Sequence, residues 1–381
     1  RQLLKAVTLS TGMGNYLNMR GNQKEDSKTG RVPDENYARE VLQLFSVGLY
    51  QLNLDGSVIS DASGKPRETY TQDSITGLAR VFTGWDYDSY NRADPLFQQR
   101  PMVFNANRHS SLEKKFLGTT IAAGTPGPDA LETALDTIAN HPNVGPFFSR
   151  QLIQRLVCSN PSPAYIARVA AVFNNNGQGV RGDLKAVIRA ILLDDEARRD
   201  PASQPNSWGK LREPVLRQVQ WARTFGASSP TDLWNIGDTS DPSRRLGQSP
   251  LRSPSVFNFF RPGYVPPNTS LGQLGLVAPE MQITNESTVV GYINWMQTLI
   301  QSGVGEVKAN YSGWLTQAND APTLVNKIAL LLSAGQLSAS SIATITNAVA
   351  SINPSSDSAR LNRIYASILL VMACPEYIVV K

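Results

Sequence analysis

The sequence predicts a mainly α protein, a single large helical domain with long ordered loops and room for a small β-hairpin. Three observations predict this fold class. Apolar residues recur with helical periodicity along most of the chain, whereas alternating strand patterns are few and short. The 381 residues are enough to bury a large core. The 28 Gly and 24 Pro residues indicate long loops between the helices.

Helical periodicity is the strongest local signal. Candidate helices cover roughly residues 2–11, 35–46, 72–83, 129–139, 145–157, 162–175, 183–194, 209–225, 286–302, 322–334, 339–351 and 357–373. Thr71 and Asp183 stand where each can cap the helix that follows, because their side-chain oxygens accept hydrogen bonds from unpaired N–H groups. Short strand-like pieces at 49–54 and 66–70 can pair with each other, and "YIVV" reads as a further strand.

Three segments organise the chain. Residues 1–225 form the expected helical core that carries the motifs, and residues 286–381 supply C-terminal helices that pack on this core. Residues 226–285 are rich in Pro, Gly and Ser, yet they contain several aromatic residues: Phe257, Phe259, Phe260 and Tyr264. A disordered linker would not carry so many aromatics, so we expect an ordered loop region. Its rings either stack on sugar rings or, as we favour, pack against the helices.

Charge and hydropathy point away from nucleic acid and from a membrane span. The net charge is +5, but Lys and Arg are scattered among acidic residues and no nucleic-acid-binding motif occurs. No run of about 18 apolar residues occurs, and the apolar segment 364–373 fits a buried helix. We therefore expect no nucleic-acid partner and no transmembrane segment. The sequence opens within a helical pattern without Met, which we interpret as the later part of a longer precursor.

The two cysteines, Cys158 and Cys374, lie far apart in the sequence. No CxxC pair or Cys/His cluster surrounds either residue, so a structural zinc site is not predicted, and metal and cofactor content stays unassigned. The cysteines either form one disulfide in an exported protein or remain two buried thiols, and both alternatives are open.

A glycine-rich GxGxxG pattern occurs at Gly177, Gly179 and Gly182. A dinucleotide site needs a strand before this pattern and a helix after it. The residues before it have helical periodicity instead. We therefore interpret the pattern as a helix–turn–helix connection in which Asp183 is the N-cap.

The candidate helix at 35–46 gathers several polar residues on one side, namely Asn36, Arg39, Glu40 and Gln43. Glu40 lies beside the apolar face of this helix. Burial there would raise the pKa of Glu40, and the adjacent Arg39 would lower it. Such tuning is typical of a general acid or base, and equally of a buried ion pair.

Other polar residues have both a functional and a structural interpretation. Arg80 can pair with a core carboxylate or hold an anion. His109 lies in a polar loop beside two lysines, where a structural role is the more frequent one. Glu213 and Arg217 have the i,i+4 spacing of an ion pair on a helix surface, and we expect an exposed pair of small energetic value.

Eight segments follow one another in a characteristic order: "PDENYAREVLQLFSVG", "YTQDSITGLARVFTGW", "NRHSSLEKKFLG", "HPNVGPFFSRQLIQRLV", "GVRGDLKAVIRAILLDDEAR", "LREPVLR", "SPSVFNFFRPGYVPP" and "LVAPEMQITNES". In this order they resemble the bacterial family catalogued as domain of unknown function 1800 (DUF1800) over almost the whole chain. The resemblance implies an exported protein, often with a twin-arginine signal and a further N-terminal helical region. It also implies a frequent genomic neighbour, an exported sulfatase-like protein.

Carried over position by position, the signature polar residues of this family are Asn36, Arg39, Glu40, Asp73, Arg80, Trp85, His109 and Lys115. Many members have an acidic residue directly after the histidine, whereas this chain has Ser110. The difference weakens any proposal in which His109 and a neighbouring carboxylate share a metal. The signature residues either form a buried polar network or line a site, and we favour the network.

Two functional hypotheses follow for an exported protein of the periplasm, cell surface or extracellular space. In the first, it is an enzyme that acts on an extracellular or envelope polymer such as polysaccharide. Glu40 would be its acid or base, helped by His109, and Arg39 and Arg80 would hold anionic groups.

In the second hypothesis, the protein is a non-catalytic secreted scaffold or surface-assembly component that works through protein–protein contacts. Its partner would be the sulfatase-like protein or further copies of itself. A pocket that contains Glu40 and Arg80 would favour the enzyme. A sealed ion pair between Glu40 and an arginine, together with broad apolar patches, would favour the scaffold.

Overall fold

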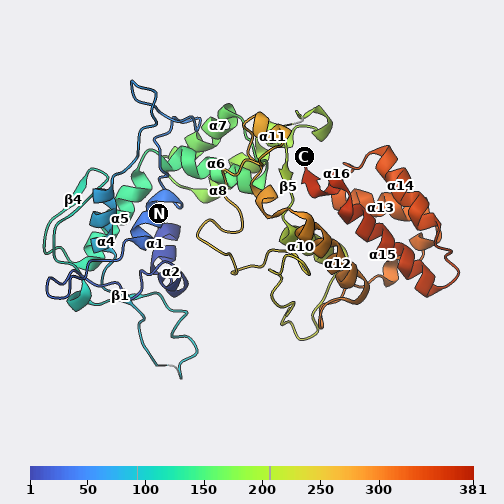
Figure 1. The fold of residues 1–381 in the computed structure, drawn as a ribbon, viewed down its shortest axis with the longest axis horizontal. Coiled ribbons are helices and arrows are strands. Elements are labelled where there is room, and N and C mark those ends of the chain that lie inside the picture. Colours follow the sequence, from blue (N-terminus) through green and yellow to red (C-terminus); the bar gives the residue numbers. More distant parts are fainter. Residues whose placement is uncertain (92, 206) are drawn as a thin grey trace. The chain divides into compact units, whose positions relative to one another are not determined.

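The computed structural model describes residues 1–91, 93–205 and 207–381 (Figure 1). These described residues form sixteen α-helices and three pairs of very short antiparallel strands. The predicted mainly α fold class is therefore confirmed. Among the described helices, none is both long and apolar enough to cross a membrane.

The chain divides into two compact units, which are described separately. Unit 1 comprises Arg1–Ile153 and Pro161–Arg198, and unit 2 comprises Gln154–Asn160 and Arg199–Lys381. The expected boundaries at residues 225 and 285 stay a prediction.

The described residues among the first 198 form nine α-helices, one 3₁₀-helix and four strands. The α-helices are α1 (Gln2–Leu9), α2 (Thr11–Tyr16), α3 (Asn36–Gln43), α4 (Gln72–Val81), α5 (Gly127–Asn140), α6 (Val144–Leu156), α7 (Pro163–Asn174), α8 (Leu184–Leu193) and α9 (Asp195–Arg198). The remaining elements are β1 (Trp85–Asp86), β2 (Val103–Phe104), β3 (Lys114–Phe116), β4 (Thr119–Ile121) and η1 (Ala106–Arg108). β1 pairs with β2, and β3 pairs with β4.

Helix α4 lies directly on the backbone of β3. The contact is close because Gly77 has no side chain: a Cβ atom there would lie 2.0 Å from the carbonyl oxygen of Lys115. The turn between β3 and β4 contains Leu117 and Gly118 with φ of 47° and 77°, the left-handed conformation that a tight hairpin turn requires. On α3 and just after α4, the buried rings of Tyr37 and Phe82 meet edge to face, 4.9 Å apart. These contacts join α3, α4 and β3 into one layered core.

The glycine-rich pattern lies in the turn between α7 and α8, as predicted. Gly177, Gly179 and Gly182 all have positive φ, between 72° and 90°. Asp183 caps α8, because its Oδ1 accepts hydrogen bonds from the backbone N–H groups of Lys185 and Ala186. The helix–turn–helix interpretation is confirmed.

The predicted pairing of 49–54 with 66–70 is confirmed by an antiparallel bridge between Tyr50 and Glu68. Asp55 and Asp61 each accept a hydrogen bond from the backbone N–H two residues later. Both carboxylates therefore stabilise turns in the segment that contains these paired residues.

The remaining elements belong to unit 2. Its α-helices are α10 (Pro214–Thr224), α11 (Ser270–Gln273), α12 (Glu286–Ser302), α13 (Ala321–Ser333), α14 (Ala339–Ala350), α15 (Asp357–Ala373) and α16 (Pro375–Ile378). The other elements are β5 (Lys210–Leu211), β6 (Val379–Val380), η2 (Pro201–Ser203), η3 (Pro279–Ile283), η4 (Ser312–Trp314) and η5 (Gln317–Asn319). Figure 1 shows α13, α14 and α15 side by side, and they pack around one apolar core that includes Trp221, Met296, Leu324, Ile328 and Ile368.

Every candidate helix has a counterpart in the structure, and the largest boundary difference has a physical reason. The helix expected from residue 209 begins at Pro214, because residues 210–211 form β5 and pair with β6. Proline is favoured in the first turn, where its missing N–H costs no hydrogen bond. The pairing also confirms the predicted "YIVV" strand at residues 379–380.

We predict that Gly77→Ala destabilises the protein by about 2–3 kcal/mol, because the new methyl group would overlap the backbone of β3. Urea unfolding followed by circular dichroism measures the effect. Gly12→Ala in α2 is the matched control, since the nearest atom to its Cβ would be 3.6 Å away. The control should be neutral or stabilising by up to about 1 kcal/mol. Equal effects of the two substitutions would contradict the close packing of α4 on β3.

Candidate functional site

The polar network of α3 is centred on Glu35, one residue before the helix. Arg39 donates to Glu35 Oε2 at 3.2 Å, and Gln72 Nε2 donates to the same oxygen at 2.8 Å. Thr76 Oγ1 donates to Glu35 Oε1 at 2.8 Å. One carboxylate therefore ties α3 to α4 through three hydrogen bonds. Glu35 is not among the predicted site residues, although its i,i+4 spacing to Arg39 was an available signal.

Glu40 is buried and stands outside this network. Its Oε2 is sealed from solvent and has no hydrogen-bond partner. Burial raises the pKa of Glu40, and the positive charge of Arg39 partly offsets the rise. The nearby Tyr70 hydroxyl is also buried without a partner, and burial raises the pKa of Tyr70 to about 12. Among the described residues, the sealed ion pair between Glu40 and an arginine is thus not formed, since Arg39 bonds to Glu35 and Gln72 instead.

His109 lies after η1 and is held by Thr83, two residues beyond the end of α4. Its Nδ1 is 2.9 Å from the Thr83 carbonyl oxygen, so in the neutral ring Nδ1–H donates there and Nε2 carries the lone pair. Nε2 is buried and has no partner. Burial lowers the pKa of His109, and the charge of Lys114 lowers it further. The imidazole is therefore neutral at physiological pH, with its basic nitrogen unoccupied.

Glu25, Ser110 and Lys114 complete a polar cluster around His109. Ser110 Oγ donates to Glu25 Oε1 at 2.8 Å, while Glu25 Oε2 is buried and has no partner. The fully buried Lys114 donates to the carbonyl oxygens of Ser110 and Leu112 at 2.9 and 3.0 Å. Burial lowers the pKa of Lys114. We name Glu25, Thr83, His109, Ser110 and Lys114 the histidine cluster.

The remaining signature residues occupy the surroundings of this cluster. Arg80 donates to the carbonyl oxygen of Glu113 at 2.9 Å, and Lys115 forms an exposed ion pair with the Glu113 side chain. Asp73 lies in the first turn of α4. The Trp85 ring is buried, and its N–H has no partner.

The four predicted catalytic residues have different local partners. Among the described residues, no hydrogen bond or ion pair joins Glu40, Arg80 and His109 to one another, and Arg39 bonds to Glu35 and Gln72. Their joint role in catalysis stays a prediction. Ser110 directly follows His109, and its hydroxyl connects the histidine loop to Glu25 through a hydrogen bond.

The expected exposed pair of Glu213 and Arg217 is wrong. Both side chains are buried, and Glu213 accepts hydrogen bonds from Arg155 at 2.7 Å and from Gln248 at 2.6 Å. The reason is that α10 begins at Pro214, which leaves Glu213 at the N-cap and outside the regular helix. Arg217 donates to a backbone carbonyl, and its guanidinium lies 4.6 Å from the centre of the Tyr292 ring.

A buried ion pair lies close by in unit 2. Lys210 Nζ is 3.0 Å from Glu280 Oε1, and both side chains are almost fully buried. Lys210 also donates to the carbonyl oxygens of Gln154 and Arg155. Glu280 Oε2 is sealed from solvent without a partner. Such a pair costs desolvation energy, so its hydrogen bonds to backbone matter for its retention. We name Arg155, Lys210, Glu213, Arg217 and Glu280 the charged cluster.

The aromatic residues of the loop region pack on cations of their own unit. The Phe260 ring is buried, and the Arg155 guanidinium lies 4.9 Å from its centre. Arg261 lies 4.7 Å from the centre of the Phe257 ring. The predicted packing against the helices therefore holds for Phe260, because Arg155 belongs to α6, whereas Phe257 contacts another residue of the loop region.

Metal ligands and disulfides are absent from the part of the chain that the structure describes. No group of three or more His, Cys, Asp or Glu side chains is arranged to hold a metal there. Cys158 and Cys374 are both buried, and neither forms a disulfide with another described residue. Cavities of about 390 and 420 Å³ open in units 2 and 1, and neither lining includes a predicted catalytic residue.

Comparison with known protein families gives a match over almost the whole chain. The family model described as "Protein of unknown function (DUF1800)" matches residues 1–379. No curated protein and no solved structure matches the chain.

We predict that Glu40→Gln stabilises the protein at neutral pH by about 1 kcal/mol, because it removes a buried, unpaired charge. Burial raises the pKa of Glu40 in the folded state, so the folded chain binds this proton more tightly than the unfolded chain does. Protonated Glu40 therefore contributes its full stabilisation below the pKa of the unfolded state. This stabilisation is lost as pH rises through the pKa of the folded state. The free energy of unfolding measured between pH 4 and 8 should fall less steeply for the variant.

Glu35→Gln is the matched control on the same helix end. It removes the ion pair to Arg39 and one charged acceptor for Gln72 and Thr76, so it should destabilise the protein by roughly 1 kcal/mol. A loss of stability for both variants would show that Glu40 is a paired structural charge.

Proposed function

Because the chain belongs to the DUF1800 family, whose description names no function, its role has to be inferred from its own surface, and we propose an exported, non-catalytic component that works through protein contacts. The observation that carries this proposal is a pair of exposed apolar residues held in a costly backbone conformation. They are Trp234 and Leu251, in the loop region of unit 2.

Leu251 and Trp234 have φ of 61° and 50°, in the left-handed region that side chains with a Cβ rarely occupy. This conformation costs roughly 1–2 kcal/mol per residue. Leu251 is fully exposed, at 103%, and Trp234 is 47% exposed, so contacts within the chain do not compensate for the cost at Leu251. Strained residues of this kind are concentrated at ligand contacts and switch regions. A partner that covers both side chains would use them as apolar anchors.

The loop segment around Trp234 is tethered. Ser228 exchanges two backbone hydrogen bonds with Lys308, and Thr231 donates to Glu306 at 2.6 Å. Further along the loop region, Asn160 brackets the backbone of Val277 with two hydrogen bonds of 2.9 and 3.0 Å. These tethers reduce the entropy that a partner would have to remove on binding.

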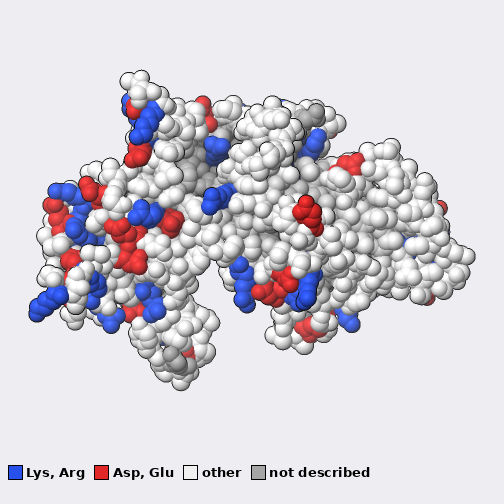
Figure 2. Space-filling model, in the orientation of Figure 1, with Lys and Arg blue, Asp and Glu red and all other residues white. Residues whose placement is uncertain are grey.

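The charge pattern of unit 2 supports the same proposal. Residues 328–356 contain no Asp, Glu, Lys, Arg or His, although Leu330 is 63% exposed. Figure 2 shows few charged side chains over α13, α14 and α15 on the visible face. Depletion of charge is the compositional mark of the core of protein–protein interfaces. The partner we propose is an exported sulfatase-like protein or a second copy of this chain, at the cell surface or in the periplasm.

A second function, acid–base catalysis on an envelope polymer, is supported by the histidine cluster. Glu25 Oε2 and His109 Nε2 are both buried without partners, and the charge of Glu25 acts on His109. A neutral imidazole with a free nitrogen is a competent general base. The cluster would have to open for a substrate to reach it.

A photo-reactive amino acid in place of Leu251 tests the first proposal in the producing bacterium. We expect one discrete cross-linked species, either the chain with itself or the chain with one other exported protein. The exposed Lys185 of α8 is the control position and should give no such species. No discrete species from position 251, or the same species from both positions, would contradict the proposal.

Leu251→Asn separates contact from structure. Asparagine adopts the left-handed conformation more readily than leucine, so the variant should gain about 1 kcal/mol of stability. It should also lose at least about tenfold in affinity for the cross-linked partner, as expected when an apolar anchor is removed. A variant that is more stable and binds as well as the unmodified chain would assign Leu251 no role in contacts.

For the second function, His109→Gln should lower the release of reducing ends from envelope polysaccharide by about 100-fold or more. Lys115→Met is the control, because Lys115 is 67% exposed and forms only a surface ion pair. Retained activity in His109→Gln would exclude the imidazole as the base.

A further inference from the structure

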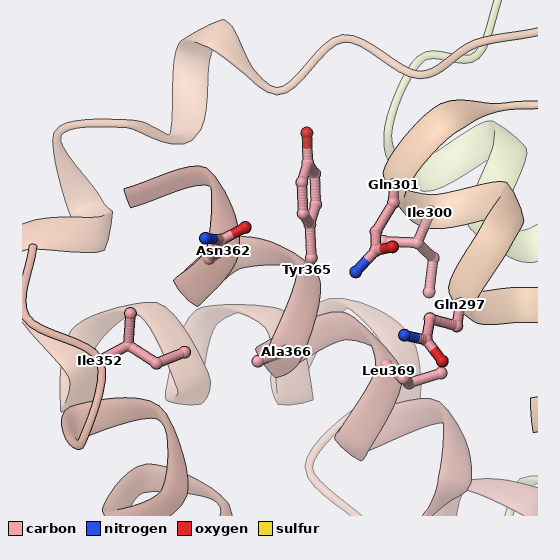
Figure 3. A pocket seen from close by; sticks show the side chains of 8 residues that line it. All are labelled: Gln297, Ile300, Gln301, Ile352, Asn362, Tyr365, Ala366 and Leu369. Carbon is pink, nitrogen blue, oxygen red and sulfur yellow. The ribbon is translucent and has the colours of Figure 1, made fainter. Parts of the chain in front are cut away.

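A cavity of about 390 Å³ lies between α12 and α15 in unit 2. Four of its lining residues are polar and uncharged, and they are Gln297, Gln301, Asn362 and Tyr365. In Figure 3, Tyr365 stands upright from α15 between Asn362 and Gln301, and Gln297 lies beside Gln301 on α12. The volume is within the usual range for small-molecule sites, about 300–1,000 Å³.

The floor of the cavity is apolar. It consists of the side chains of Ile300, Ile352, Ala366 and Leu369, and Ile300 is buried in the core of the unit. In Figure 3, Ala366 lies at the base of Tyr365, and Leu369 lies one turn further along α15. Polar groups around an apolar floor are the usual composition of a site for a compact organic ligand.

The polar lining has unused hydrogen-bonding capacity. Among the residues that the structure describes, none of the four polar side chains hydrogen-bonds to another residue. Three carboxamides and one phenol together offer both donors and acceptors. The eight lining residues include no Asp, Glu, Lys, Arg or His, so the cavity provides no counter-charge for an anion or a cation.

Neighbouring side chains hold two walls of the cavity in place, the wall formed by Tyr365 and the wall formed by Ile352. The Tyr365 ring meets the buried ring of Tyr311 edge to face at 5.5 Å. The buried Arg363 donates to the carbonyl oxygen of Ile352 at 2.6 Å and to that of Ala318 at 3.1 Å, which fixes the segment that carries Ile352. A preformed lining reduces the entropic cost of binding.

We propose that this cavity binds a neutral saccharide ring. Hydroxyl groups of such a ring pair with the carboxamides and the phenol, and its C–H face lies on the apolar floor. An alkyl chain would make no hydrogen bonds with the four polar groups, of which Gln297, Gln301 and Asn362 are exposed at the mouth of the cavity. A peptide strand would need a free backbone edge, whereas the lining comes mainly from two helices whose backbone groups bond internally. The proposal goes beyond the contact role assigned to the loop region, and either can fail without the other.

Ligand-observed saturation-transfer NMR and calorimetry on the full chain test the proposal. The probes are glucose, galactose, mannose, N-acetylglucosamine and their short oligomers, with galacturonic acid as the charged comparison. We expect at least one neutral probe to bind with a Kd of about 1 mM or lower, and galacturonic acid to bind at least about tenfold more weakly. Absence of binding by every neutral probe at about 10 mM would overturn the proposal.

Variants assign the binding to this cavity. The double variant Gln301→Leu/Asn362→Leu should weaken binding by at least about tenfold, and Tyr365→Phe by about threefold. Asn294→Leu is the control, since Asn294 is an exposed residue of α12 outside the lining. Circular dichroism verifies that each variant is folded. Unchanged affinity in the double variant, or equal losses in the control, would also overturn the proposal.

Discussion

The close approach of α4 to β3 is the constraint on which unit 1 depends. Because Gly77 has no side chain, the helix can lie on the backbone of Lys115. The residues at the start of α4 then reach Glu35 and fix α3, while Thr83, beyond its end, holds His109. One small residue in the middle of a helix thereby positions polar groups near both of its ends. The signature residues of the family are best understood from this arrangement, since most of them lie on or beside these three elements.

Unit 2 buries several of its charged side chains and keeps part of its surface free of charge. Lys210 and Glu280 form a buried pair, and Glu213 is buried beside Arg155, whereas residues 328–356 carry no charge at all. Buried charges require fixed partners, because removing one partner leaves the other unpaired in a low-dielectric environment. The charged cluster therefore favours one specific arrangement of the loop region around β5 and α10, and it leaves the outer helices free to present apolar and amide side chains.

Helix periodicity predicted the helices of both units because it records which faces are buried, and the paired "YIVV" strand was also accessible from its composition. Side-chain partners were not accessible in the same way. Glu40 was singled out, yet Glu35 forms the network, because the partners of a carboxylate depend on α4, which is distant in sequence. Glu213 was misassigned because a proline moved the helix start by one turn. The strained conformation of Leu251 has no signal in a single sequence, since nothing local requires it.

The pairing of β5 with β6 has a consequence for biosynthesis. Leu211 pairs with Val379, so the strand that precedes α10 receives its partner only after all the helices from α10 to α16 have been made. Contacts between residues so distant in sequence form slowly, because a long loop has to close first. On the ribosome, residues 1–198 can therefore collapse while the second unit is still being synthesised. The edge of β5 stays unpaired throughout that interval, and its short length and its lysine limit the pairing of this edge with other chains.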